Sequence, residues 1–152
     1  MKNWLLIGCA LLLLFGCEST SELENEISQI PVDIEVVRFD KIFGKANPSD
    51  LPRLKGEFPE FFPPQYADSI WLNRMADTLQ RMQEEEVLKV FPSEEKLATD
   101  LANLFQHIKY YDPQFRVPRV YTAISDVDYR ARIIPTQDYL VCLLYTSPSP
   151  RD

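Results

Sequence analysis

The densest group of charged side chains that could do chemistry lies in the stretch SDVDYRAR, residues 125–132. Asp126 and Asp128 are two residues apart, so on a strand their carboxylates would share one face and could bind a hard cation through oxygen. Arg130 and Arg132 follow closely and could pair with the same carboxylates instead. Two aspartates without further ligands are more typical of a strand end or turn, where backbone N–H groups and arginine satisfy them. We therefore expect a structural role for this pair, with cation binding as the alternative.

Other residue types that support catalysis are scarce. His107 is the only histidine, so neither a histidine-based zinc site nor a Ser-His-Asp triad can be assembled from this sequence. His107 is expected beside Leu104 and Ile108 at the edge of a helix. We expect its imidazole to pack or to form hydrogen bonds, with catalysis as the alternative. Only four glycines occur, and Gly8 and Gly16 lie in the N-terminal segment, so no phosphate-binding loop is predicted. We predict no enzymatic activity, no catalytic or metal-binding residue and no cofactor.

The N-terminus has the pattern of an export signal. A short positive segment precedes the apolar run Trp4–Phe15, which is shorter than the about 20 residues needed to span a bilayer. At its end, LFGC precedes the polar stretch ESTSELENE, a pattern that resembles a bacterial lipobox. We predict a lipoprotein signal peptide over residues 1–16 and attachment of lipid, palmitate included, at Cys17. The alternative is an ordinary secretory signal with an incidental cysteine.

The three cysteines support this interpretation. Cys9 is a poorer lipidation site than Cys17, because cleavage there would leave residues 10–15 as an apolar N-terminus. Cys17 would carry lipid and Cys142 lies in a C-terminal tail that we expect to be non-native, so the processed domain has no cysteine pair for a disulfide scaffold or a cysteine-based zinc site. Loss of residues 1–16 removes Lys2 and takes the net charge from −7 to −7 − 1 = −8. Such an acidic chain is a poor nucleic-acid binder, so we expect the lipid anchor to supply its membrane attachment.

Residues 17–30 are polar and acidic, and we expect a flexible tether there. The folded part is predicted to begin near Pro31, and the alternating stretch 32–39 predicts a strand. Five prolines in residues 44–64 leave room only for short helical turns, one of them capped by Asn47 or Ser49. This segment also contains three phenylalanines, Phe58, Phe61 and Phe62. We expect them to pack beneath a loop, with a ligand site as the alternative.

Two amphipathic helices come next. The first is predicted over 68–90, capped by Asp68, with a core stripe of Trp71, Met75, Leu79 and Met82. Within it, Glu84, Glu85 and Glu86 are expected on a solvated face, because consecutive helical residues cannot converge on one ion. The second is predicted to follow an N-cap at Ser93, with a stripe of Leu97, Leu101, Leu104, Phe105 and Ile108, and to stop before Pro113.

The sequence from Val117 onward is rich in β-branched and aromatic residues and divides into two or three strands. The predicted fold class is α+β: an N-terminal strand, two main amphipathic helices, then C-terminal strands that form part of an incomplete sheet.

Four separated stretches are similar to one known family: DIEVVRFDKIF, FPEFFPPQYADSIWLNRMADTLQ, LFQHIKYYDPQF and VPRVYTAISDVDY. Together they resemble the first half of the GldB gliding-motility lipoproteins over about residues 30–141. The resemblance implies a lipid-anchored protein of the cell envelope, facing the periplasm from the outer membrane. It also implies a part in gliding motility and the linked type IX secretion, through contacts with other motility and secretion proteins and without catalysis.

The C-terminus fits this family less well. The strand-like run 139–144 is followed by TSPSPRD, with no closing turn or partner strand in view. Members of the family run to roughly twice the matched length, so we expect a truncated GldB-like domain at 31–141 and a non-native tail at 142–152. The alternative is the first half of a zinc-metallopeptidase-like envelope lipoprotein, with an HExxH motif beyond residue 141. A surface lipoprotein that binds nutrients is a third possibility, but Trp71 is expected on the core stripe.

Overall fold

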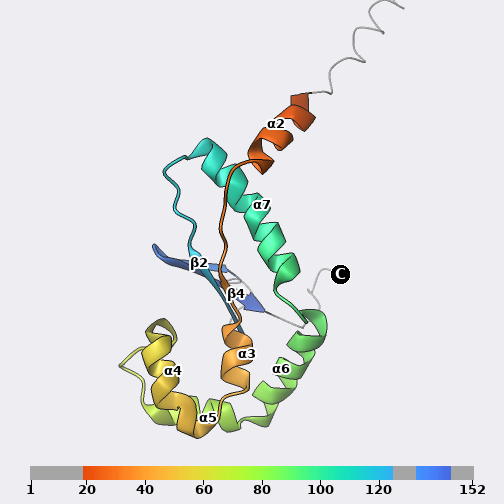
Figure 1. Cartoon of the computed structure of the whole chain (residues 1–152). Coiled ribbons are helices and arrows are strands. Elements are labelled where there is room, and N and C mark those ends of the chain that lie inside the picture. The colour runs from red at the N-terminus through yellow and green to blue at the C-terminus, as the bar shows by residue number, and fades with distance from the viewer. Residues whose placement is uncertain (1–18, 125–132, 145–152) are drawn as a thin grey trace, which may run out of the picture. The chain divides into compact units, whose positions relative to one another are not determined.

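The computed structural model describes residues 19–124 and 133–144 (Figure 1). Contacts within the chain define two units. The first combines the segment up to Asp33 with Thr99–Val117, and the second combines Ile34–Ala98 with the segment from Pro118 onward.

The second unit contains an open four-stranded sheet with the order β1-β2-β4-β3. Its strands are β1 (Val36–Val37), β2 (Arg119–Ile124), β3 (Ile133–Pro135) and β4 (Tyr139–Leu144). Strand β2 pairs in parallel with both β1 and β4, whereas β3 pairs with β4 in the antiparallel sense. Together with the helices, this mixed sheet confirms the predicted α+β class.

Strand β4 lies inside the sheet, between β2 and β3. Its partners run from Arg119 opposite Tyr139 to Ile124 opposite Leu144. Both of its partner strands precede it in the sequence, so the strand is paired although the sequence predicts no partner strand after residue 144. The predicted boundary at residue 141 also falls inside a strand, since Cys142 pairs with Thr122 on β2 and with Ile133 on β3.

Short helices fill the proline-rich segment, as predicted. They are the 3-10 turn η2 (Pro48–Asp50), α4 (Leu51–Glu57) and the 3-10 turn η3 (Pro59–Phe61), and helix α3 (Phe39–Gly44) precedes them. Asn47 is the N-cap of η2, and its backbone N–H donates to the Asp50 carboxylate at 2.8 Å. Proline begins both 3-10 turns because its fixed φ suits a first helical position, where no N–H donor is needed.

The predicted N-terminal strand is much shorter than residues 32–39. Only Val36–Val37 pairs with β2, and helix α3 already begins at Phe39. Because Phe39 and Phe43 lie four residues apart on this helix, both rings reach the same core. A strand would have sent Phe39 and its neighbour Asp40 to opposite faces.

The helix predicted over 68–90 is broken at Asp77. Its two parts are α5 (Asp68–Ala76) and α6 (Thr78–Val90), so Asp68 is the first helical residue rather than the cap. Asp77 is extended, and its carboxylate accepts a hydrogen bond from the Leu79 N–H at 2.9 Å, which makes it the N-cap of α6.

This break shifts the helical phase and ends the predicted stripe. Met75 is buried, but Leu79 and Met82 are 60% and 59% exposed. The residues of α6 that enter the interior are instead Gln80 and Val87.

Two alanine substitutions distinguish the broken helix from a continuous one. Met75→Ala is expected to lower the free energy of unfolding by about 2 kcal/mol or more, because it leaves a cavity. Leu79→Ala is expected to change it by less than about 0.5 kcal/mol, since that side chain is largely in water. Urea denaturation followed by circular dichroism measures both. Similar losses in the two variants would favour one unbroken stripe.

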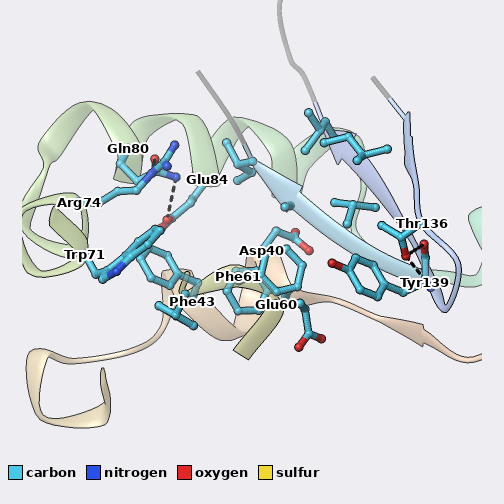
Figure 2. Close-up of a pocket in the computed structure, with 17 residues that line it drawn as sticks. Asp40, Phe43, Glu60, Phe61, Trp71, Arg74, Gln80, Glu84, Thr136 and Tyr139 are labelled. Atoms are coloured by element: carbon cyan, nitrogen blue, oxygen red, sulfur yellow. Dashed lines mark hydrogen bonds between the residues drawn. The ribbon is translucent and has the colours of Figure 1, made fainter. Parts of the chain in front are cut away.

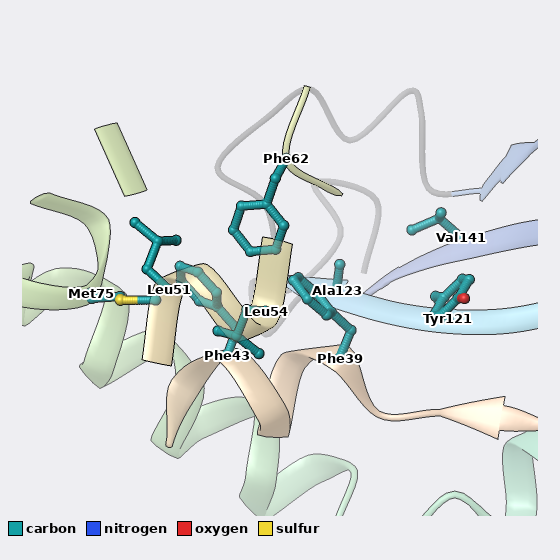
Figure 3. Packing of buried hydrophobic residues seen from close by; sticks show 9 residues of the cluster. All are labelled: Phe39, Phe43, Leu51, Leu54, Phe62, Met75, Tyr121, Ala123 and Val141. Carbon is teal, nitrogen blue, oxygen red and sulfur yellow. The ribbon is translucent and has the colours of Figure 1, made fainter. Parts of the chain in front are cut away.

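Aromatic rings form the centre of the second unit's core (Figure 3). Its buried members are Phe39, Phe43, Leu51, Leu54, Phe62, Met75, Tyr121, Ala123 and Val141. Phe39 stacks on Phe61 with ring centroids 3.9 Å apart and meets Phe58 and Phe62 edge-on. The packing role expected for the three phenylalanines of 58–62 is thus confirmed.

The first unit contains a helix where a tether was expected. Helix α2 (Ser19–Ser28) occupies most of residues 17–30, and Ile27 within it is buried. The amide of Gln106 donates to the carbonyls of Ser28 at 3.1 Å and Ile30 at 3.0 Å. The segment is therefore ordered by contacts with residues more than seventy positions away.

Helix α7 (Glu95–Tyr111) starts in the second unit and continues into the first. Its first turn closes with a hydrogen bond from the Ala98 N–H to the Glu94 carbonyl at 2.8 Å, so the helix begins one residue later than a Ser93 cap would place it. Of the predicted stripe, Leu101 and Phe105 are buried and Leu104 is exposed.

Candidate functional site

A pocket of about 320 Å³ opens in the second unit, between the helices and the C-terminal strands (Figure 2). Four phenylalanines and a tryptophan line it: Phe39, Phe43, Phe61, Phe62 and Trp71. Aliphatic side chains come from the strands: Ala123, Ile124, Ile134, Val141 and Leu143. The polar lining consists of Asp40, Glu60, Arg74, Gln80, Glu84, Thr136 and Tyr139. A largely apolar pocket in which several polar groups converge has the character of a ligand site.

One wall carries a chain of hydrogen bonds across the break between α5 and α6. Arg74 Nε donates to Gln80 Oε1 at 3.0 Å, and Gln80 Nε2 donates to Glu84 Oε1 at 3.3 Å (Figure 2). Residues six apart on a continuous helix point in widely different directions, whereas four apart they share a face. The turn at Asp77 therefore brings Arg74 beside Gln80, and the regular spacing of α6 adds Glu84.

Glu84 is the lining residue that the sequence did not identify. Burial raises its pKa, and Asp40 raises it further, against the opposing effects of the Gln80 hydrogen bond and of Arg81 and Arg74. The expectation of a solvated face holds for Glu85 and Glu86, which are exposed, but not for Glu84. Only the packing of α6 against α3 decides which of the three glutamates turns inward.

Gly44 provides the room for the Glu84 carboxylate. A Cβ at this position would lie 2.6 Å from Glu84 Oε2. The missing side chain therefore lets α3 and α6 approach closely enough for Glu84 to reach the pocket.

Gly44→Ala is expected to displace the Glu84 carboxylate and to return its pKa toward the ordinary value near 4.5, because the side chain would move into water. The unfolding free energy should change little, since the clash involves only the end of a flexible side chain. Carboxyl NMR titration measures the shift. Gly56→Ala is the matched control, because a Cβ there meets nothing within 4 Å. An unchanged Glu84 pKa in Gly44→Ala would contradict the close approach.

A buried ion pair lies next to the pocket. Arg38 holds Asp40 with two hydrogen bonds, Nε to Oδ1 at 2.9 Å and Nη2 to Oδ2 at 2.7 Å. The hydroxyl of Thr122 on β2 donates to the same carboxylate, and Arg38 Nη1 donates to the Phe91 carbonyl at 3.0 Å. The pair thus joins α3, the sheet and the end of α6.

Tyr139 lines the strand side of the pocket and contacts a second tyrosine, Tyr121, on β2. Burial raises the pKa of Tyr121, as does its hydrogen bond to Glu60, against the effect of Arg119. Tyr139 packs edge-on to Tyr121 with centroids 5.8 Å apart. Its backbone is fixed by Thr136, whose hydroxyl donates to the Tyr139 carbonyl at 2.7 Å and accepts from the Tyr139 N–H at 3.0 Å.

The residues singled out in the sequence are mostly elsewhere. Cys17, Asp126 and Asp128 lie outside the described residues. Cys142, on β4, is a free thiol whose pKa is raised by burial. Within residues 19–124 and 133–144, no three His, Cys, Asp or Glu side chains come together in a way that could hold a metal ion.

His107 makes the hydrogen bonds that the sequence favoured. Its Nδ1 lies 2.7 Å from the Asn103 carbonyl, and its Nε2 lies 3.2 Å from Glu24 Oε2. Both partners accept hydrogen bonds, so the doubly protonated ring satisfies them best. The Asn103 carbonyl and then Glu24 raise the pKa of His107.

His107→Gln is expected to flatten the dependence of stability on pH above about pH 6.5. Because the folded-state pKa is raised, the stabilisation is fully present below the ordinary value near 6.5 and is lost as pH rises through the folded pKa. Thermal unfolding at a series of pH values measures this loss of stability. Glu24→Gln should retain part of the dependence, since the Asn103 carbonyl remains. A wild-type profile as flat as that of His107→Gln would contradict the raised pKa.

The described part of the chain is thus an α+β protein with an open mixed sheet and an aromatic pocket that has one charged wall. Residues 20–145 match the family described as gliding motility protein GldB, and the chain belongs to this family of cell-envelope lipoproteins. The match starts within the predicted tether and continues four residues past the predicted boundary at 141. No curated protein and no solved structure matches the chain. Within the described residues, no helix is long and apolar enough to cross a membrane.

Proposed function

We propose that this protein is a noncatalytic component of the gliding motility machinery and of the type IX secretion linked to it. The family match over residues 20–145 carries the proposal. Under this proposal, residues 1–16 are the signal peptide, and lipid on Cys17 anchors the chain in the outer membrane, facing the periplasm.

Contacts with other motility and secretion proteins are the proposed mode of action. Exposed apolar side chains on α6 support it, because such groups mark interaction surfaces when they gather on one element. Leu79, Met82 and Val90 are each more than half exposed.

Deletion of the gene in its native host tests the role in the cell. We expect loss of colony spreading and retention of type IX cargo inside the cell, both restored by the wild-type gene. Normal spreading in the deletion strain would overturn the motility role, and normal export would remove the link to type IX secretion. The metallopeptidase alternative would instead show as peptidase activity of the native protein that chelators abolish.

Cys17→Ala is expected to abolish metabolic labelling by palmitate and to release the protein from the membrane fraction, because the acyl chains supply the attachment. Cys9→Ala and Cys142→Ala are matched controls that should label normally. Label that persists in Cys17→Ala would overturn the anchor assignment.

A further inference from the structure

The aromatic pocket has the size and composition of a small-ligand site. Its volume of about 320 Å³ is at the lower end of the range for such sites, and aromatic rings from α3, η3 and α5 form its walls. Trp71, one of these rings, packs edge-on against Phe62 with centroids 5.1 Å apart. The site therefore suits an apolar body of modest size.

The carboxylates that line the pocket differ in how much of their hydrogen-bonding capacity is already used. The Asp40 carboxylate is satisfied by Arg38 and Thr122, and Glu60 bonds to the Tyr121 hydroxyl. Among the described residues, Glu84 accepts its hydrogen bond from the neutral amide of Gln80, at the long distance of 3.3 Å, and Arg81 and Arg74 act on it through their charge alone. Among the described lining residues, Glu84 is thus the carboxylate with the most unused hydrogen-bonding capacity.

We propose that this pocket binds an organic cation, an apolar or aromatic group with one ammonium or guanidinium, whose charge lies against Glu84 and whose body lies against the rings. A partly desolvated carboxylate attracts a cationic donor more strongly than a neutral one. Trp71 also lines the pocket, and an indole ring there can add cation–π attraction. The cation is either a lysine or arginine side chain of a protein or a free amine, because both present the same chemistry.

The proposal includes a dependence on pH. Glu84 must be ionised to bind a cation, so affinity falls as pH falls through its raised pKa. The charged groups that line the same two pockets as this carboxylate are Asp40 and Lys41 of α3, the C-cap Lys45 that follows it, Arg74 of α5, and Arg81 and Glu85 of α6. The decline in affinity should start at a higher pH than for an ordinary glutamate.

Trp71 provides a direct readout. The sequence has two tryptophans, Trp4 and Trp71, so in the full chain with Trp4→Phe all indole fluorescence comes from the pocket. We would titrate this protein with 4-phenylbutylamine, 4-phenylbutanol and 4-phenylbutyrate, which share one body and differ in charge. The amine is expected to bind about tenfold more tightly than the alcohol, and the carboxylate most weakly. Equal affinities, preference for the carboxylate, or no fluorescence change with any of the three would overturn the proposal.

Glu84→Gln tests the residue itself. It should lower the affinity for the amine about tenfold and leave the alcohol unchanged, because only the charge is removed. Glu85→Gln, the same change on the exposed neighbour, is the control and should have little effect. Equal loss in both variants would mean a general effect of net charge and would overturn the role of Glu84.

A capped peptide with one arginine distinguishes the two sources of the cation. If it binds more tightly than the free amine and Glu84→Gln weakens it, the occupant is a basic side chain of a protein. If the free amine binds, Glu84→Gln weakens its binding and the peptide does not bind, the occupant is a small molecule. Failure of both overturns the proposal. These titrations use purified protein, so their outcome is independent of the gliding assay.

Discussion

Replacement of Asp40 by asparagine is expected to lower the free energy of unfolding by about 3–5 kcal/mol. The substitution keeps the shape of the side chain but removes its charge, so the guanidinium of Arg38 stays buried without a counterion. It also weakens the link from α3 to Thr122 on β2. Urea denaturation followed by circular dichroism measures the loss.

An exposed ion pair provides the control for Asp40→Asn. Glu57→Gln disrupts the contact between Glu57 and Arg53, which has the same N–O distance of 2.7 Å as the buried pair. Because both side chains are about half exposed, water screens the pair and the loss should stay below about 1 kcal/mol. Comparable losses at the two sites would contradict the importance of burial.

Phe39→Ala is expected to cost about 3–5 kcal/mol of unfolding free energy. The ring contacts four other phenylalanines, Phe43, Phe58, Phe61 and Phe62, and its removal leaves a cavity among rigid neighbours. Some of that cavity would join the pocket, because Phe39 also lines it. The same denaturation experiment measures the effect.

Phe39→Leu is the matched control for the alanine variant. It keeps most of the apolar volume and loses the stacking on Phe61, so less than half of the alanine effect is expected. A loss below about 1 kcal/mol in Phe39→Ala would mean that the core collapses readily around the missing ring, contrary to the close packing described.

The sequence alone supported the features that depend on local patterns. Helix α7 and strands β2 and β4 follow from the spacing of apolar residues and from β-branched composition, which act within a few positions. Prolines restrict the chain at their own positions, so the short helices of residues 44–64 were foreseeable. The family resemblance also rested on the sequence, and the match over residues 20–145 confirms it.

The break at Asp77 shows where local patterns were insufficient. Helical spacing continues across this residue in the sequence, and its side chain could either stay in a helix or cap the next one. The burial of Met75 and Gln80 on either side selects the cap. A prediction from helical spacing places apolar residues in the interior, so it placed Leu79 there instead of the polar Gln80.

Only the tertiary structure decided the candidate site. Asp40 and Thr122 are 82 residues apart, and they meet because β1 and β2 pair in parallel. Glu84 differs from Glu85 and Glu86 only in its direction on α6 and in the space that Gly44 leaves for it. Burial, ion pairing and pocket shape depend on such distant neighbours, whereas the formation of a helix or strand depends largely on adjacent ones. For this protein the sequence therefore determined most elements and the family, and tertiary packing determined which charged side chains face the pocket.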